Sequence, residues 1–259
     1  FYLILSLFLI FITQQNSFLK ITDIHSSLTI LFLVIMSLGI SHGAADSIVI
    51  WKIFPKIKIK AIAFLIYLLV VSLGLLLWFL SPILGLITLL LMSIIHFGQS
   101  DLSYLSGVTQ GIKISWGFVM SLLPVVFFEN DVKSIFEALV DSDINAEVFA
   151  NLKIITIIFI GSFLFLVYIN KDINKKDKSF LTLEFLITLI LAGLLQPLYW
   201  FTFYFCFLHG LRALINIGIK SLGDFILLIF FTLPVTFFSY YILLEGLKTV
   251  SYTHLTLPT

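Results

Sequence analysis

Charged residues are scarce in this chain of 259 residues: they make up 11% of it, against 60% apolar residues. A typical soluble domain carries about 25% charged and about 45–50% apolar residues. So little charge cannot cover a water-facing surface, which excludes soluble enzymes, nucleic-acid-binding proteins and disordered proteins. The composition predicts an all-α, polytopic integral membrane protein with the lipid bilayer around it and no nucleic-acid partner.

Cysteine is nearly absent as well, since Cys206 is the only one. A single cysteine excludes a disulfide framework and a cluster of thiolate metal ligands. Any bound metal must therefore be held by histidine or carboxylate. The sequence also lacks a glycine-rich phosphate loop and a nucleophile elbow. Nucleotide chemistry and serine hydrolysis of the familiar kinds are thereby excluded.

Long apolar runs fill most of the chain. A bilayer core about 30 Å thick needs about 20 apolar helical residues. Proline cannot continue the hydrogen bonding of a preceding helix, so Ser81-Pro82 and Gln196-Pro197 predict breaks between helices. The alternative for residues 180–219 is one long helix kinked at Pro197. With both breaks, about eight or nine transmembrane helices are expected, near 2–13, 28–50, 61–80, 83–103, 112–129, 152–169, 180–195, 198–219 and 222–245.

We expect residues 1–250 to form a single membrane domain. The apolar run Phe1–Ile12 has no positive segment before it and no small-residue cleavage site. These features favour a clipped membrane helix over a signal peptide. Residues 251–259 are polar and rich in threonine, and we expect them to be a truncated or non-native tail.

Lysine is concentrated in two short segments, 51–60 and 170–179, which carry four lysines each. Short loops rich in lysine remain in the cytoplasm. The long 130–151 segment, expected to be a loop, carries five acidic residues and one lysine, and it falls on the opposite side when crossings are counted from either lysine segment. This pattern predicts a multi-pass protein of the inner (plasma) membrane.

Three of the expected spans each bring one histidine into the membrane: His42, His96 and His209. An ionisable residue inside a span costs on the order of 2.5–3.5 kcal/mol, so it is a functional candidate. At 1.5 Å per helical residue, all three lie roughly 10–15 Å inside the cytoplasmic face. Three imidazoles at one depth suit a transition metal such as iron, copper or zinc. A single histidine near a helix end is more often only structural, and both interpretations stay open here.

Three further polar residues stand beside these histidines. Asp46 is four residues after His42, on the same helical face, where it could accept a proton from the imidazole and fix its tautomer. Asp101 is five residues after His96, a poorer position for orienting that imidazole, and the alternative is that it only caps the end of its span. Arg212, the only arginine, is three residues after His209 and could bind a carboxylate such as Asp46 or Asp101, or extend to the headgroups.

An aromatic run, residues 199–205, comes shortly before His209. It could line a pocket for a long conjugated hydrocarbon, or it could form an interfacial belt at the end of a span.

The sequence resembles the Brp/Blh family of membrane β-carotene 15,15′-dioxygenases at three motifs. These are S-H-G-A-A-D at 41–46, I-I-H-F-G-Q-S-D at 94–101 and F-Y-F-C-F-L-H-G-L-R at 203–212. The resemblance implies a helical membrane bundle that binds Fe(II) and uses O₂ to cleave β-carotene, or a related carotenoid, into two retinals. It also implies that His42, His96 and His209 are the iron ligands and the catalytic residues.

The sequence departs from this family at Ala213. The family's third motif has a second histidine four residues after the first, and an alanine stands there in this chain. Two alternatives to the dioxygenase are therefore kept. One is a homologue that binds a carotenoid or another lipid without cleaving it, and the other is a small transporter or proton relay that uses the intramembrane His and Asp residues.

Overall fold

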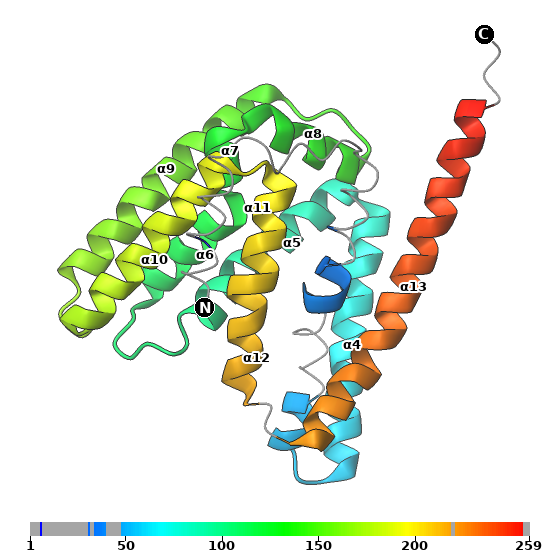
Figure 1. The fold of residues 1–259 in the computed structure, drawn as a ribbon, viewed down its shortest axis with the longest axis horizontal. Helices are drawn as coiled ribbons and strands as arrows, with labels where there is room; N and C mark the ends of the chain where they lie inside the picture. The colour runs from blue at the N-terminus through cyan, green and yellow to red at the C-terminus, as the bar shows by residue number, and fades with distance from the viewer. Residues whose placement is uncertain (1–5, 7–30, 32–33, 40–47, 219–220, 256–259) are drawn as a thin grey trace.

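The computed structural model describes residues 6, 31, 34–39, 48–218 and 221–255, without the side chains of residues 37, 38, 235 and 242–255. Within these residues the chain is all-helical (Figure 1). The helical elements are η1 (Ile35–Gly39), α4 (Ile57–Leu80), α5 (Pro82–Asp101), α6 (Gln110–Leu122), α7 (Pro124–Phe127), α8 (Glu129–Val140), α9 (Ala146–Ile169), α10 (Lys175–Leu194), α11 (Pro197–Phe203), η2 (Tyr204–Gly210), α12 (Leu211–Ile217) and α13 (Leu222–Leu255).

Five stretches of the described chain are long and apolar enough to cross a membrane, namely α4, α5, α9, the continuous run from Pro197 to Ile217, and Leu222–Tyr241 of α13. The exposed side chains of α4 are mostly Leu, Ile and Val, as expected of a helix that faces lipid. The structure thus supports a helical membrane protein. The expected total of eight or nine crossings stays a prediction, since the helices expected at 2–13 and 28–50 fall largely outside the described residues.

Both proline breaks are confirmed. Pro82 is the first residue of α5 and Pro197 the first residue of α11, the position where a proline's missing N–H costs nothing. Residues 180–219 are therefore not one kinked helix. A third proline, Pro124, divides the helix expected at 112–129 into α6 and α7. At the other end of the chain, α13 continues beyond its expected end at 245 to Leu255.

The segment 130–151 is not the long loop that was expected, because α8 and the first residues of α9 occupy most of it. Its apolar residues recur at helical spacing and pack inward, with Val132 and Val140 buried and Phe136 against Phe149 of α9. The acidic residues on the other face of α8 concealed this pattern. The helix is capped by the next residue, Asp141, whose φ of 50° is a left-handed conformation that aspartate tolerates better than most residues.

Hydrogen bonds gather several loops at one end of the molecule. Helix α8 lies at the other end, where Glu129 pairs with Lys153 near the start of α9, a helix about 36 Å long. The lysine segments 51–60 and 170–179 lie at the end where these loops meet, and the acidic segment 130–151 lies at the opposite end. The contacts that join the loops are Asn170 Nδ2 to Gly107 O at 3.0 Å, Asn216 Nδ2 to Ser103 Oγ at 2.9 Å and Lys52 Nζ to Asp224 Oδ2 at 3.0 Å.

Helices α5 and α6 approach each other more closely than any side chain would allow. A Cβ atom on Gly117 would lie 1.8 Å from the carbonyl oxygen of Ile94, and one on Gly98 would lie 2.1 Å from that of Lys113. Only glycine fits at such a crossing. This contact fixes the position of Asp101 at the end of α5 relative to Trp116 in the middle of α6. The run α11–η2–α12 crosses α5 on another side and brings the third motif to the same point (Figure 1).

Candidate functional site

Asp101 lies at the centre of a buried polar cluster. Its carboxylate is fully buried, and the Oδ2 atom accepts hydrogen bonds from Trp116 Nε1 at 2.9 Å and from the Tyr204 hydroxyl at 2.7 Å. The other oxygen, Oδ1, lies 2.6 Å from Nδ1 of His209, which is also fully buried. Three helical elements, α5, α6 and η2, therefore meet at one carboxylate. A buried charge is tolerated when it is paired and hydrogen-bonded, as this carboxylate is.

His96 and His209 are brought together. Their ring centroids are 5.0 Å apart and the rings meet edge-on, at 70°. Phe97 lies beside both, with its ring 4.7 Å from that of His209, and Phe205 stacks on His209 at 5.7 Å. The common depth predicted for these two histidines is consistent with this contact. His42 and Asp46 lie outside the described residues, so their positions stay predictions.

Arg212 does not extend to the headgroups. Its Nη2 donates to Glu184 Oε1 of α10, and its Nη1 donates to the backbone oxygen of Asp101 at 3.0 Å. Among the described residues, the carboxylate that it binds is that of Glu184, and it meets Asp101 only through the backbone oxygen. Glu184 is 1% exposed and was missed by the sequence analysis, although an acidic residue in an apolar helix is itself a signal. Asp101 likewise does more than cap α5, because its side chain holds His209.

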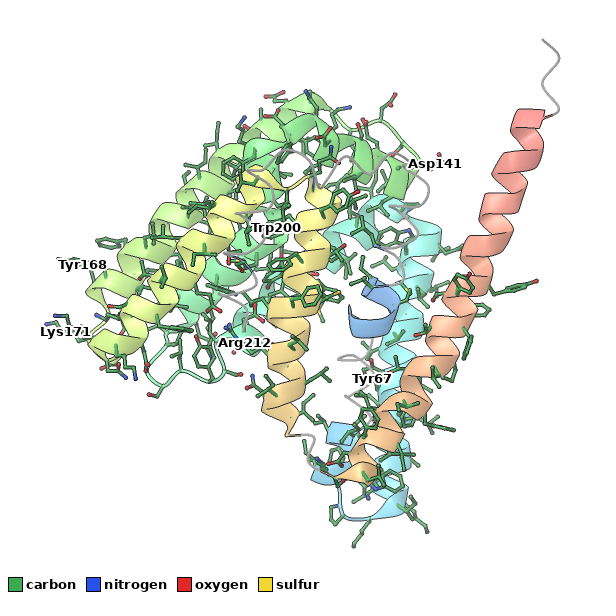
Figure 2. The ribbon with its side chains drawn as sticks, viewed as in Figure 1. Tyr67, Asp141, Tyr168, Lys171, Trp200 and Arg212 are labelled. Carbon is green, nitrogen blue, oxygen red and sulfur yellow. The ribbon has the colours of Figure 1, made fainter. Side chains whose placement is uncertain are left out.

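Tyr104 completes the edge of the cluster. The Arg212 guanidinium lies 4.8 Å from the centre of the Tyr104 ring, within the range of a cation–π contact. Burial, together with the nearby Glu184 carboxylate, raises the pKa of Tyr104 to about 12. The phenol is therefore neutral at physiological pH and presents an uncharged ring to the cation. Figure 2 shows Arg212 on the run α11–η2–α12.

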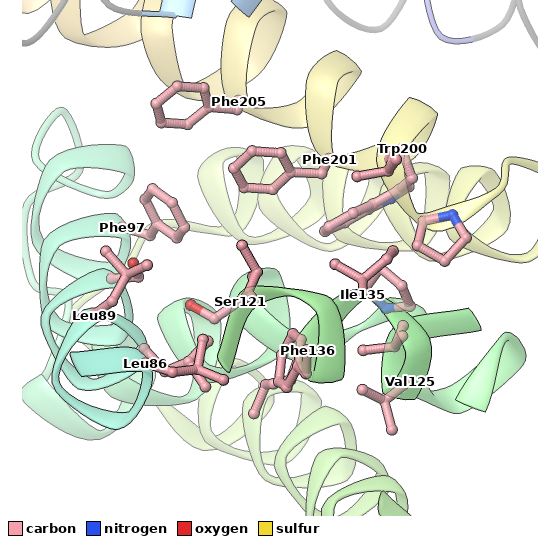
Figure 3. Close-up of a pocket in the computed structure, with 18 of the residues that line it drawn as sticks. Leu86, Leu89, Phe97, Ser121, Val125, Ile135, Phe136, Trp200, Phe201 and Phe205 are labelled. Atoms are coloured by element: carbon pink, nitrogen blue, oxygen red, sulfur yellow. The ribbon is translucent and has the colours of Figure 1, made fainter. Parts of the chain in front are cut away.

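An apolar cavity of about 630 Å³ extends from His96 to the underside of α8 (Figure 3). Its walls come from α5, α6, α7, α8, α11 and η2, and its polar residues are Ser93, His96 and Ser121. The Ser121 hydroxyl is engaged with the backbone oxygen of Gly117, which leaves the wall still more apolar. Three residues of the aromatic run, Trp200, Phe201 and Phe205, line the cavity. These three residues therefore line a pocket, and the conjugated hydrocarbon expected in it stays a prediction.

Comparison with known proteins identifies the family. A family model described as β-carotene 15,15′-dioxygenase matches residues 33–244, most of the chain. The chain belongs to this family. It is also 28% identical over 190 residues to a β-carotene 15,15′-dioxygenase from uncultured marine bacterium 66A03, and the alignment covers 69% of this chain. The same alignment covers 65% of that relative, slightly less than two thirds of its length. No solved structure matches the chain.

Membership of the β-carotene 15,15′-dioxygenase family raises the question of whether these residues fit an iron ion. The part of the chain that the structure describes contains no group of three or more His, Cys, Asp or Glu residues able to hold a metal. It does contain two adjacent imidazoles, His96 and His209, and a carboxylate bonded to Nδ1 of the second. A carboxylate in that position is the usual companion of a metal-ligating histidine. The two histidines therefore fit two positions of such a site, and a third ligand must come from elsewhere.

Proposed function

We propose that this chain is an iron-dependent dioxygenase that cleaves β-carotene, or a closely related carotenoid, at its central double bond. One molecule of O₂ supplies one oxygen atom to each of the two carbons of that bond, and two molecules of retinal leave. The observation that carries this proposal is the position of His96, which lines the apolar cavity and touches His209. A metal held by these histidines would stand at the wall of a pocket suited to a hydrocarbon.

The cavity suits a polyene by both chemistry and size. Its walls are leucine, isoleucine, valine and phenylalanine side chains with few polar groups, as in pockets that select apolar ligands. Its volume of about 630 Å³ lies within the range of pockets that bury organic ligands, about 300–1,000 Å³. A polyene bound in it would lie with part of its chain next to His96.

His96, His209 and His42 would hold the iron, which supplies the O₂ chemistry that amino-acid side chains lack. His42 lies outside the described residues, but the chain before it is anchored at the site. A Cβ atom on Gly39, three residues earlier, would lie 2.7 Å from the Phe205 ring, and that ring stacks on His209. Gly39 thus lies near His209, and the place of His42 beside the other two histidines is part of the proposal.

The chain's own residues have three tasks in this reaction. Phe97, Phe201 and Phe205 bind the polyene and keep water away from the reacting bond. Asp101 orients His209, and the Arg212–Glu184 pair holds the end of α12 against α5 and α10.

The test is reconstitution of the purified protein in detergent with Fe²⁺, followed by addition of β-carotene under air. We expect iron to remain bound after desalting and retinal to appear as the only aldehyde, at two molecules for each β-carotene consumed. His96→Ala and His209→Ala should each lose both iron and activity. Stable iron binding without retinal formation, or retinal formation that survives both substitutions, would exclude the proposal.

Ala213 favours a second candidate, a homologue that binds carotenoid without cleaving it. Ala213 is buried and stands one helical turn after His209, where the family motif has a second histidine. Alanine cannot ligate a metal, so one ligand fewer is available here. Ala213→His separates the two candidates. If the wild-type chain is inactive and Ala213→His gains iron binding and cleavage, the natural chain is a carotenoid-binding protein. If the wild-type chain is itself active, it is a dioxygenase.

A further inference from the structure

The two oxygens of Asp101 have separate tasks. Both neutral donors, the indole N–H of Trp116 and the hydroxyl of Tyr204, donate to Oδ2. Oδ1 faces His209 Nδ1 at 2.6 Å. Indole can only donate a hydrogen bond. Since the donors at Oδ2 anchor one side of the carboxylate, Oδ1 is directed at the imidazole.

A π-helix makes this arrangement possible. In an α-helix, residues five apart point about 140° away from each other. In a π-helix the hydrogen bonds join residues five apart, so such residues lie much closer to the same face than they do in an α-helix. Tyr204 and His209 are the first residue and the sixth of η2, and both side chains reach Asp101. The wider turn of η2 thus lets this one element supply both Tyr204, which anchors the Asp101 carboxylate, and His209, whose imidazole the carboxylate holds.

We propose that Asp101 is a positioning residue that keeps His209 in the tautomer with its proton on Nδ1, with Tyr204 and Trp116 holding the carboxylate for this purpose. A carboxylate only accepts hydrogen bonds, so the imidazole nitrogen facing it carries the proton. The lone pair of the ring is then on Nε2, the nitrogen that would ligate iron. This consequence for metal binding rests on the proposed function, whereas the tautomer belongs to the metal-free chain.

Asp101 is itself fixed from its backbone. Arg212 Nη1 donates to the Asp101 carbonyl at 3.0 Å, and the same guanidinium binds Glu184. Gly98, three residues before Asp101, lies against the backbone of α6. The main chain and the side chain of Asp101 are therefore both held in place. The Arg212 hydrogen bonds also resist small movements of α12 relative to α5, next to the contact between Asp101 and His209.

The experiment compares wild-type protein with Asp101→Asn. Metal-free protein labelled with ¹⁵N-histidine is studied by NMR at a pH where imidazole is neutral, and His209→Gln assigns the signal. An asparagine can keep its oxygen toward Trp116 and Tyr204 while its NH₂ group donates to His209 Nδ1. We expect the His209 proton on Nδ1 in the wild type and on Nε2 in the variant. Fe²⁺ alone, titrated without oxygen against a chelator, should bind the variant about 10–100-fold more weakly.

Two further variants complete the comparison. Asp143→Asn makes the same chemical change at an exposed position and should alter neither tautomer nor Fe²⁺ affinity. Tyr204→Phe removes one anchor and should weaken Fe²⁺ binding less than Asp101→Asn does, with the tautomer kept. If Asp101→Asn does not fold, the wild-type spectrum and Tyr204→Phe decide the matter.

A wild-type His209 protonated on Nε2 overturns the positioning role, as does an Asp101→Asn variant with an unchanged tautomer and unchanged Fe²⁺ affinity. A tautomer that switches as expected, in a protein that releases no retinal from β-carotene, supports the positioning role and excludes the proposed function.

Discussion

Asp101 Oδ1 and His209 Nδ1 lie 2.6 Å apart although 108 residues separate them along the chain. This contact joins the second of the three sequence motifs to the third, because Asp101 ends one and His209 belongs to the other. A carboxylate and an imidazole that are both fully buried stabilise the structure only while each keeps its partner. The contact therefore depends on the close packing of α5, α6 and the run α11–η2–α12 around it.

The glycine crossing between α5 and α6 provides the first prediction. Gly117→Ala places a methyl group 1.8 Å from the Ile94 carbonyl oxygen, so the two helices must separate. We expect a loss of about 1–3 kcal/mol of stability, the usual cost of overpacking, together with a weaker Asp101–Trp116 hydrogen bond. Thermal unfolding in detergent and the fluorescence of Trp116 measure the two effects.

Gly161→Ala is the matched control, since a Cβ atom on Gly161 in α9 meets nothing within 4 Å. Alanine favours a helix over glycine by about 1 kcal/mol, so this variant should be unchanged or more stable. Equal changes in the stability of Gly117→Ala and Gly161→Ala would contradict the close contact between α5 and α6.

The Arg212–Glu184 pair gives a second prediction. Glu184→Leu leaves a mostly buried guanidinium without its carboxylate, and breaking a buried pair costs about 3–5 kcal/mol. Because Arg212 is 17% exposed, we expect the lower part of that range. The double variant Glu184→Leu/Arg212→Met removes both charges and should recover most of the loss in an unfolding experiment. If both variants are equally unstable, the loss comes from packing and the pair contributes nothing.

Sequence reasoning predicted the parts of this molecule that single residues determine. Pro82 and Pro197 begin helices because proline cannot continue one, and the lysine segments share one end of the molecule. His96 and His209 were expected at one depth, and they touch. Local rules were sufficient for the helix breaks, and the contact of the two imidazoles is consistent with the common depth expected for them.

Features that depend on tertiary contact could not be predicted in this way. The π-helix at Tyr204–Gly210 contains no proline or internal glycine to signal it, and it is held by contacts of Tyr204 and His209 with another helix. Arg212 had several conceivable carboxylate partners, and only the packing of α10 selects Glu184. Helix α8 was missed for a different reason: acidic residues on its outer face were given more weight than the apolar spacing on its inner face.

The turn between α8 and α9 predicts a dependence on pH. Hydrogen bonds from the Lys133 side chain and from the Ile144 N–H hold the pKa of Glu137 below its usual range. A depressed carboxyl pKa contributes stability above the unfolded-state pKa, near 4.3, and this contribution is lost as the pH falls through the folded-state value. Protection of the Ile144 amide against hydrogen exchange, corrected for the intrinsic rate, should therefore decrease in acid. Glu137→Gln should remove the pH dependence, and an unchanged profile in that variant would contradict the assignment.

The apolar cavity gives the last prediction. Ile135 on α8 lines the cavity, whereas the adjacent Ser134 is exposed on the outer face of the same helix. Ile135→Trp fills part of the space without adding charge, and we expect carotenoid binding at least about tenfold weaker, equivalent to about 1.4 kcal/mol. Ser134→Trp adds the same side chain outside the cavity and should bind as the wild type does. Absorbance of β-carotene that co-purifies with each variant, together with its unfolding temperature, separates loss of the pocket from loss of the fold. If Ile135→Trp retains full binding and an unchanged unfolding temperature, the polyene binds outside this cavity.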